Sequence, residues 1–138
     1  MNPLISPQAN LVLQIVIFAV LFTSMGFKQK RRYVMHGILT LAAVLLNTLS
    51  FVLIMGPSLF GLEIISAQPF HIVSVVTVLH AVFGIVALIL GFWLLAAWRL
   101  RSNVKECFKR KTVMRLTMFS WMASLFLGFL FYYLAYIY

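Results

Sequence analysis

The chain has 138 residues, of which 64% are hydrophobic and only 9% are charged, and its formal net charge is +9. A soluble domain carries roughly 25% charged and 45–50% apolar residues, so this composition excludes a water-soluble fold. One membrane-spanning helix needs ~20 apolar residues, which leaves room for about four spans and no separate soluble domain. The single Cys107 excludes an internal disulfide. The segment MNPLISPQAN lacks the basic start of a cleavable signal peptide, so we expect the first span to be retained.

The pattern of prolines and glycines predicts one integral membrane domain, residues 1–138, with four helical spans. Ser6 and Pro7 are typical of a helix start, and Gly26 marks the expected end of that helix. Gly56 follows the second apolar run, and Pro69 precedes the third. The predicted spans are residues 8–26, 34–55, 70–100 and 104–137. Short connections favour an all-α membrane protein, an antiparallel four-transmembrane-helix bundle.

The basic residues are confined to two places in the chain. Four precede span two and seven flank the connection between spans three and four: Lys28, Lys30, Arg31, Arg32, Arg99, Arg101, Lys105, Lys109, Arg110, Lys111 and Arg115. Loops rich in Lys and Arg stay cytoplasmic, which predicts a multi-pass cell-membrane protein with both termini outside.

Anionic lipid headgroups are the expected contacts of these basic residues. We assign this role to Arg31, Arg32, Lys109, Lys111 and Arg115. Sidedness alone explains the positive charge, so we expect no nucleic acid as a partner. Trp93, Trp98 and the tyrosines near the C-terminus are expected to lie in interfacial aromatic belts.

Small and polar residues repeat at helical spacing on each predicted span. The repeats are Gln14, Ile17, Leu21 and Ser24; His36, Thr40, Ala43, Asn47 and Ser50; Thr77, His80, Gly84, Ala87 and Gly91; and Thr117, Trp121, Ser124 and Gly128. Membrane helices associate through small residues and interhelical hydrogen bonds, so these stripes are expected to face the bundle interior. A rise of ~1.5 Å per residue puts His80 and Asn47 at similar depth. We therefore predict a hydrogen bond between them, shared with Thr77 or Ser50.

An intramembrane histidine is a candidate functional residue. His80 is expected either to fasten two helices or to ligate a buried haem b as an axial ligand. His36 lies nearer the cytoplasmic end, too far from His80 to share one iron with it. Met114, Met118 and Met122 form a row that suits copper(I), but packing is the favoured interpretation.

Catalysis finds little support in the sequence. Its only acidic residues are Glu63 and Glu106, and no nucleophile, metal cluster or phosphate-binding glycine loop can be assembled. We therefore expect no enzymatic activity. A proton or solute path along His36, Thr40, Asn47 and His80 would make the chain a small transport or channel subunit.

The segments VMHGILTLAAVLLN, VLHAVFGIVALILGFWLLAAWR and CFKRKTVMRLTMFSWMASLFLGFLFYY resemble the small four-span proteins of domain-of-unknown-function family 420. The likeness covers about residues 30–138. It implies a role beside respiratory-complex subunits, in the assembly of haem-copper oxidases or in haem handling. A haem-b electron carrier that uses His80 is the alternative, and a transport or channel subunit is the second. A homo-oligomer is a further possible assembly that the sequence does not decide.

Overall fold

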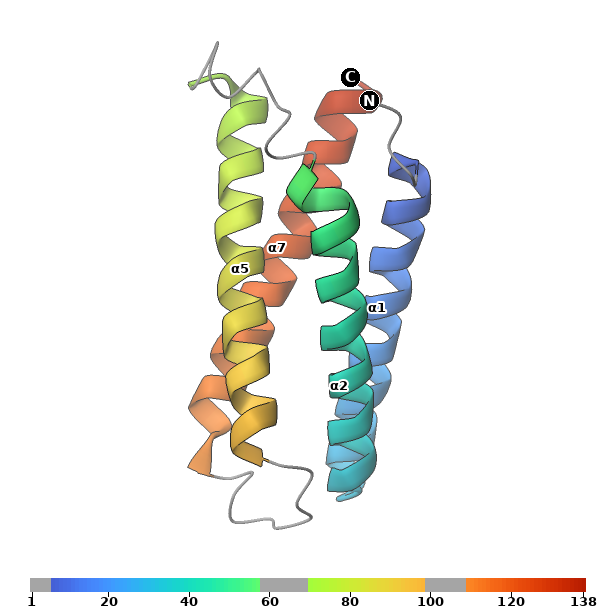
Figure 1. Cartoon of the computed structure of the whole chain (residues 1–138), viewed down its shortest axis with the longest axis vertical. Helices are drawn as coiled ribbons and strands as arrows, with labels where there is room; N and C mark the ends of the chain where they lie inside the picture. Colours follow the sequence, from blue (N-terminus) through green and yellow to red (C-terminus); the bar gives the residue numbers. More distant parts are fainter. Residues whose placement is uncertain (1–5, 58–69, 99–108) are drawn as a thin grey trace.

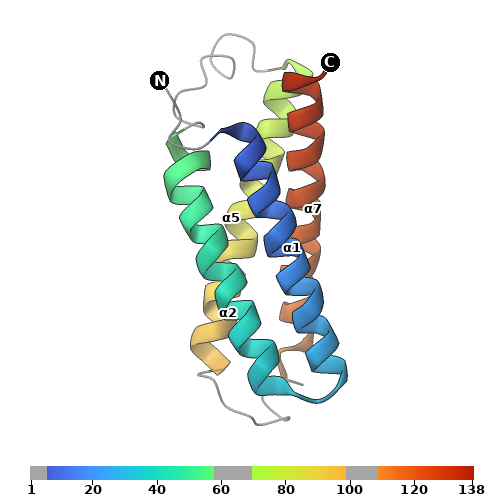
Figure 2. The same ribbon diagram turned by 90° about the vertical axis from the view of Figure 1, so that its right-hand side faces the viewer.

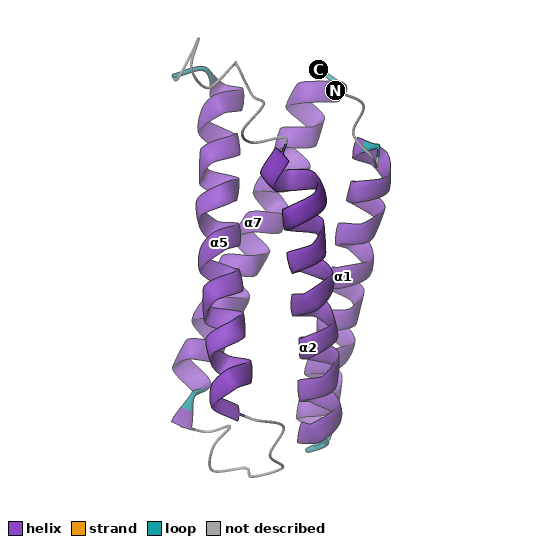
Figure 3. Ribbon diagram, in the orientation of Figure 1, coloured by secondary structure: helices purple, strands orange, loops and turns teal. Residues whose placement is uncertain are grey.

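The computed structural model describes residues 6–57, 70–98 and 109–138, and nearly all of them are helical (Figures 1 and 3). The helices are α1 (Pro7–Gln29), α2 (Tyr33–Ser50) with its π-helical continuation η1 (Phe51–Met55), α5 (Ile72–Trp98) and α7 (Lys111–Tyr136). All four spans, with α2 and η1 counted together, are long and apolar enough to cross a membrane. This confirms the prediction of an all-helical chain with four helices that are long and apolar enough to span a membrane.

The ends of the helices differ in part from the prediction. Ser6 caps α1 as expected, since its hydroxyl accepts a hydrogen bond from the Ala9 amide at 3.2 Å. The helix does not end at Gly26 but continues to Gln29. A single glycine inside an apolar run costs only ~1 kcal/mol and does not stop a helix. The reversal occurs instead at Arg31, whose φ of 58° is left-handed. The expected start of span four, 104, lies outside the described residues.

The helices lie side by side along one long axis, and the start of α1 and the end of α7 lie at the same end (Figures 1 and 2). The opposite end carries the α1–α2 turn, the last turn of α5 and the first turn of α7. We call it the basic end, because it holds Lys28, Lys30, Arg31, Arg32, Lys111 and Arg115.

Packing divides the four helices into two pairs. α1 packs mainly against α2 and α5 mainly against α7, while contacts between the two pairs are sparser. A central apolar cluster nevertheless joins all four: Ile17, Leu21, Ala43, Val44, Ala87, Trp121 and Leu125. We refer to α1 with α2 as the first pair and to α5 with α7 as the second pair.

The predicted polar stripes largely face inward. On α1 the buried residues are the four predicted ones: Gln14, Ile17, Leu21 and Ser24. Members of the other stripes are also buried, namely Ala43, Asn47, Ser50, Thr77, Ala87, Gly91, Thr117, Trp121 and Ser124. The outer faces are apolar, with Phe22 70% and Phe126 69% exposed. This distribution is inverted relative to a soluble protein and fits helices surrounded by lipid.

Two glycines allow side chains from neighbouring helices to approach the backbone. A Cβ on Gly37 of α2 would overlap the indole ring of Trp98 from α5. A Cβ on Gly128 of α7 would lie 3.0 Å from Cε1 of His80. The missing side chain of Gly37 leaves room for the ring of Trp98, of which only 8% is exposed, so this residue packs between helices. Its place in an interfacial belt stays a prediction.

Candidate functional site

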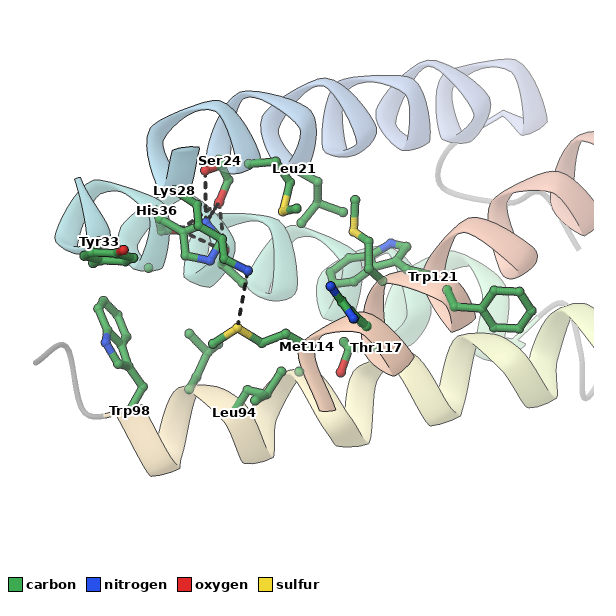
Figure 4. A pocket seen from close by; sticks show the side chains of 18 of the residues that line it. Leu21, Ser24, Lys28, Tyr33, His36, Leu94, Trp98, Met114, Thr117 and Trp121 are labelled. Atoms are coloured by element: carbon green, nitrogen blue, oxygen red, sulfur yellow. Dashed lines mark hydrogen bonds between the residues drawn. The ribbon is translucent and has the colours of Figure 1, made fainter. Parts of the chain in front are cut away.

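A cavity of about 390 Å³ lies near the basic end, and all four helices line it (Figure 4). Its size falls in the range of small-molecule and cofactor sites. Most of its walls are apolar, aromatic or thioether groups. These are Leu21, Met25, Leu94, Leu95, Trp98, Met114, Met118, Phe119, Trp121 and Met122.

The methionines from two helices distinguish this wall. The α7 row that the sequence assigned to packing faces the cavity through Met114, Met118 and Met122, and Met25 of α1 joins them. Thioethers are flexible and polarisable, so they adapt to a flat or irregular apolar ligand. They also ligate soft metal ions.

Two cationic side chains line the cavity as well. The Lys28 ammonium lies 3.9 Å from the thioether sulfur of Met114, a weak acceptor, and Arg115 is exposed at the same cavity. The described ranges contain no aspartate or glutamate, since Glu63 and Glu106 both fall outside them. An anionic group in the cavity would therefore meet two cations that have no carboxylate partner among the described residues.

His36 lines the cavity with one ring nitrogen held by α1. Its Nδ1 lies 3.0 Å from the backbone oxygen of Ser24 and 2.7 Å from the Ser24 hydroxyl. In the tautomer with the proton on Nδ1, the ring donates to this carbonyl oxygen, which can only accept. The Ser24 hydroxyl then donates to the His36 carbonyl at 2.9 Å, and Thr40 donates to the same oxygen at 2.8 Å. In the neutral ring, Nε2 is left with a lone pair.

His80 has the same bonding pattern in the second pair. Its Nδ1 donates to the backbone oxygen of Ser124 at 2.7 Å, and the Ser124 hydroxyl donates to the His80 carbonyl at 3.2 Å. The His80 ring packs against Gly128 and does not line the cavity.

The predicted bond between His80 and Asn47 is wrong. Among the described residues, His80 bonds to α7, because α5 packs mainly against α7 and only sparsely against α2. Equal depth placed the two residues at one level, but it did not determine which helices are neighbours. Thr77 donates within its own helix to the Val73 carbonyl at 2.7 Å. Ser50 accepts from Gln14 at 3.0 Å and donates to Asn10 at 2.8 Å, both on α1.

The predicted lipid contacts all lie at the basic end. Arg31, Arg32, Lys109, Lys111 and Arg115 are exposed. Of these, Arg115 alone lines the cavity. The neighbouring Arg110 lies over the Trp93 ring, 5.9 Å from its centroid.

Three residues of this site could not be recognised from the sequence pattern. Lys28 was counted only as a topology signal, Gly37 was not placed on a stripe, and Trp98 was assigned to the interface. Their roles depend on which helices are neighbours, which spacing along one helix does not reveal. Ser24 was placed on the correct face, and its approach to His36 could have been expected from the short connection between their helices.

No protein-family model, curated protein or solved structure matches this chain. The resemblance to domain-of-unknown-function family 420 therefore stays a prediction. Among the described residues, no three His, Cys, Asp or Glu side chains gather as a metal site. The arrangement as a whole suits an apolar ligand with an anionic group and an atom that accepts a lone pair.

Proposed function

We propose that this protein is a non-enzymatic, multi-pass membrane protein that holds an amphipathic anion in its cavity and transfers it to a partner in the same membrane. In this proposal the helices form an antiparallel bundle with both termini outside. The basic end then faces the cytoplasm, so the ligand enters from the inner half of the bilayer.

The observation that carries this proposal is the position of two cations beside an apolar cavity. Lys28 and Arg115 have no carboxylate among the described residues, while the walls between them are apolar. An anionic group bound here would form charge-assisted hydrogen bonds with the partly buried Lys28 and the exposed Arg115, and such bonds are stronger than neutral ones. An apolar tail or ring system would fill the remaining volume.

Assembly of a respiratory complex is the setting that the family resemblance supports. A chain with this apolar, cation-lined cavity and only two acidic residues suits delivery of a cofactor or lipid better than chemistry on it. Haem handling is one form of this role. The cavity favours His36 over His80 as the histidine involved, because only His36 lines it.

Native mass spectrometry of the full chain, extracted in lipid nanodiscs, tests the proposal. We expect one bound amphiphile per chain and its loss when Lys28→Gln and Arg115→Gln are combined. The matched control combines Lys30→Gln and Arg32→Gln, which removes the same charge at the same end from residues that do not line the cavity. Equal retention of ligand in both double variants would contradict the proposal.

The orientation is tested by cysteine labelling from the two sides of the membrane. In a Cys107→Ser background, Gln8→Cys at the terminal end and Lys30→Cys at the basic end are both exposed. We expect an impermeant thiol reagent added to intact cells to label the first and not the second. The reverse pattern would contradict both termini being outside.

A further inference from the structure

We propose that the ligand of the cavity is haem b, with Nε2 of His36 as an axial ligand of the iron. This inference rests on the proposed function and gives it a specific ligand. Three observations carry it: the contacts that hold Nδ1 of His36 against Ser24, the thioethers that line the cavity, and the two cations.

The hydrogen bonds of His36 prepare its ring to bind a metal. Metal-bound histidines usually donate their other ring N–H to a carbonyl or carboxylate, which fixes the tautomer and the ring plane. His36 does this through Nδ1 and the Ser24 carbonyl at 3.0 Å. No described side chain hydrogen bonds to its Nε2. This nitrogen of a cavity-lining ring is therefore available for an iron atom.

The wall on α7 offers a ligand for the other face of the iron. Figure 4 shows His36 on the side of the first pair and Met114 on the side of α7. Met118 lies one turn further along α7 and also lines the cavity. Histidine with methionine is a known axial pair for haem iron, and thioether ligation raises its reduction potential. Trp98, Trp121 and Phe119 supply flat apolar surface for the macrocycle.

The two cations and the His36 imidazole together favour haem over other occupants. Lys28 and Arg115 match the two propionates of haem, whereas they would repel a bare copper ion. The carbonyls of a quinone would accept hydrogen bonds from Lys28 or Arg115, but a quinone carries no anionic group to neutralise the two cations and makes no bond to an imidazole lone pair. A fatty acid or phospholipid would use the cations and the apolar walls but not the imidazole lone pair.

Hemin titration of the purified full chain in nanodiscs tests the inference, followed by absorption spectroscopy. We expect one haem per chain, a Soret band with a reduced α-band, and a magnetic circular dichroism spectrum of histidine ligation. His36→Gly should weaken binding by at least ~10–100-fold, the range that loss of a supporting partner alone produces. Added imidazole should restore the spectrum of this variant, while His80→Gly should bind as the wild-type chain does.

Two outcomes would overturn the inference. The first is no Soret band with a chain that remains helical and monodisperse, and the second is a spectrum lost in His80→Gly and kept in His36→Gly. The imidazole rescue separates loss of a ligand from loss of the fold. If native mass spectrometry finds a fatty acid or phospholipid that Lys28 and Arg115 hold, haem is wrong while the proposed function stands. If no amphiphile of any kind is bound, both fail.

Discussion

The two helix pairs contain the same Ser–His arrangement in different surroundings. In the first pair Ser24 holds His36, and in the second Ser124 holds His80, each through the serine carbonyl to Nδ1 and the serine hydroxyl to the histidine carbonyl. The His80 ring packs against Gly128, whereas the His36 ring lines a cavity with cations and thioethers.

This difference shows that hydrogen bonding alone does not distinguish a fastening histidine from a ligand-binding one. Both rings have Nδ1 bound and one nitrogen left over. What separates them is the space beside that ring and the charge around it. The second pair uses its histidine for close packing, and the first pair uses the same bonds to orient a ring toward a cavity.

The largest expected effect concerns the packing of Trp98, a residue that lines the cavity, against Gly37. Gly37→Ala places a methyl group where the Trp98 ring lies, and overpacking of this kind costs about 1–3 kcal/mol. Gly26→Ala is the control, since its added Cβ meets nothing within 4 Å. We expect the control to be neutral or to stabilise by ~0.5–1 kcal/mol, as alanine is the better helix former. Unfolding in mixed detergent measures the free energy of unfolding of both variants. An equal change in the two variants would contradict the close packing of Trp98 against Gly37.

The second effect compares the two histidines directly in ligand-free protein. His80→Ala should lower the free energy of unfolding by ~1–2 kcal/mol, because it removes an interhelical bond and the contact with Gly128. His36→Ala should cost less than ~1 kcal/mol, because its ring already borders open space. The exposed His71→Ala serves as the control, with no measurable change expected. A larger loss for His36 would mean that the first pair is the one fastened by packing.

The smallest effect identifies the partner of His80. A double-mutant cycle between His80→Ala and Ser124→Ala should give a coupling of up to ~0.6 kcal/mol, because it measures only the contact between the Ser124 hydroxyl and His80 Nδ1 at 3.3 Å. The two bonds to backbone oxygens are each removed by one variant alone. The cycle between His80→Ala and Asn47→Ala should give a value within ~0.3 kcal/mol of zero. A larger coupling energy with Asn47 than with Ser124 would instead support Asn47, the partner predicted from the sequence.

Much of the fold can be predicted from the sequence, because helical periodicity acts within one element. The four apolar runs predicted the four helices, and the inner face of α1 was predicted residue by residue from Gln14 to Ser24. The end of α1 was missed by three residues, because Gly26 was given more weight than the continuing helix.

The candidate site was harder to predict, since it depends on contacts between elements. Depth along the membrane placed His80 level with Asn47 but did not indicate that α7 would be its neighbour. Backbone acceptors such as the Ser124 carbonyl have no signature in sequence. Trp98 illustrates the same limit, because its burial depends on a glycine more than sixty residues away on another helix.

Native mass spectrometry of the His36→Ala and His80→Ala variants, prepared side by side from the same cells, tests the central claim most directly. The claim is that the two Ser–His arrangements differ in function because only one borders a charged cavity. We expect His80→Ala to retain one bound anionic amphiphile per chain and His36→Ala to lose most of it. Full retention by His36→Ala, or loss confined to His80→Ala, would contradict the claim.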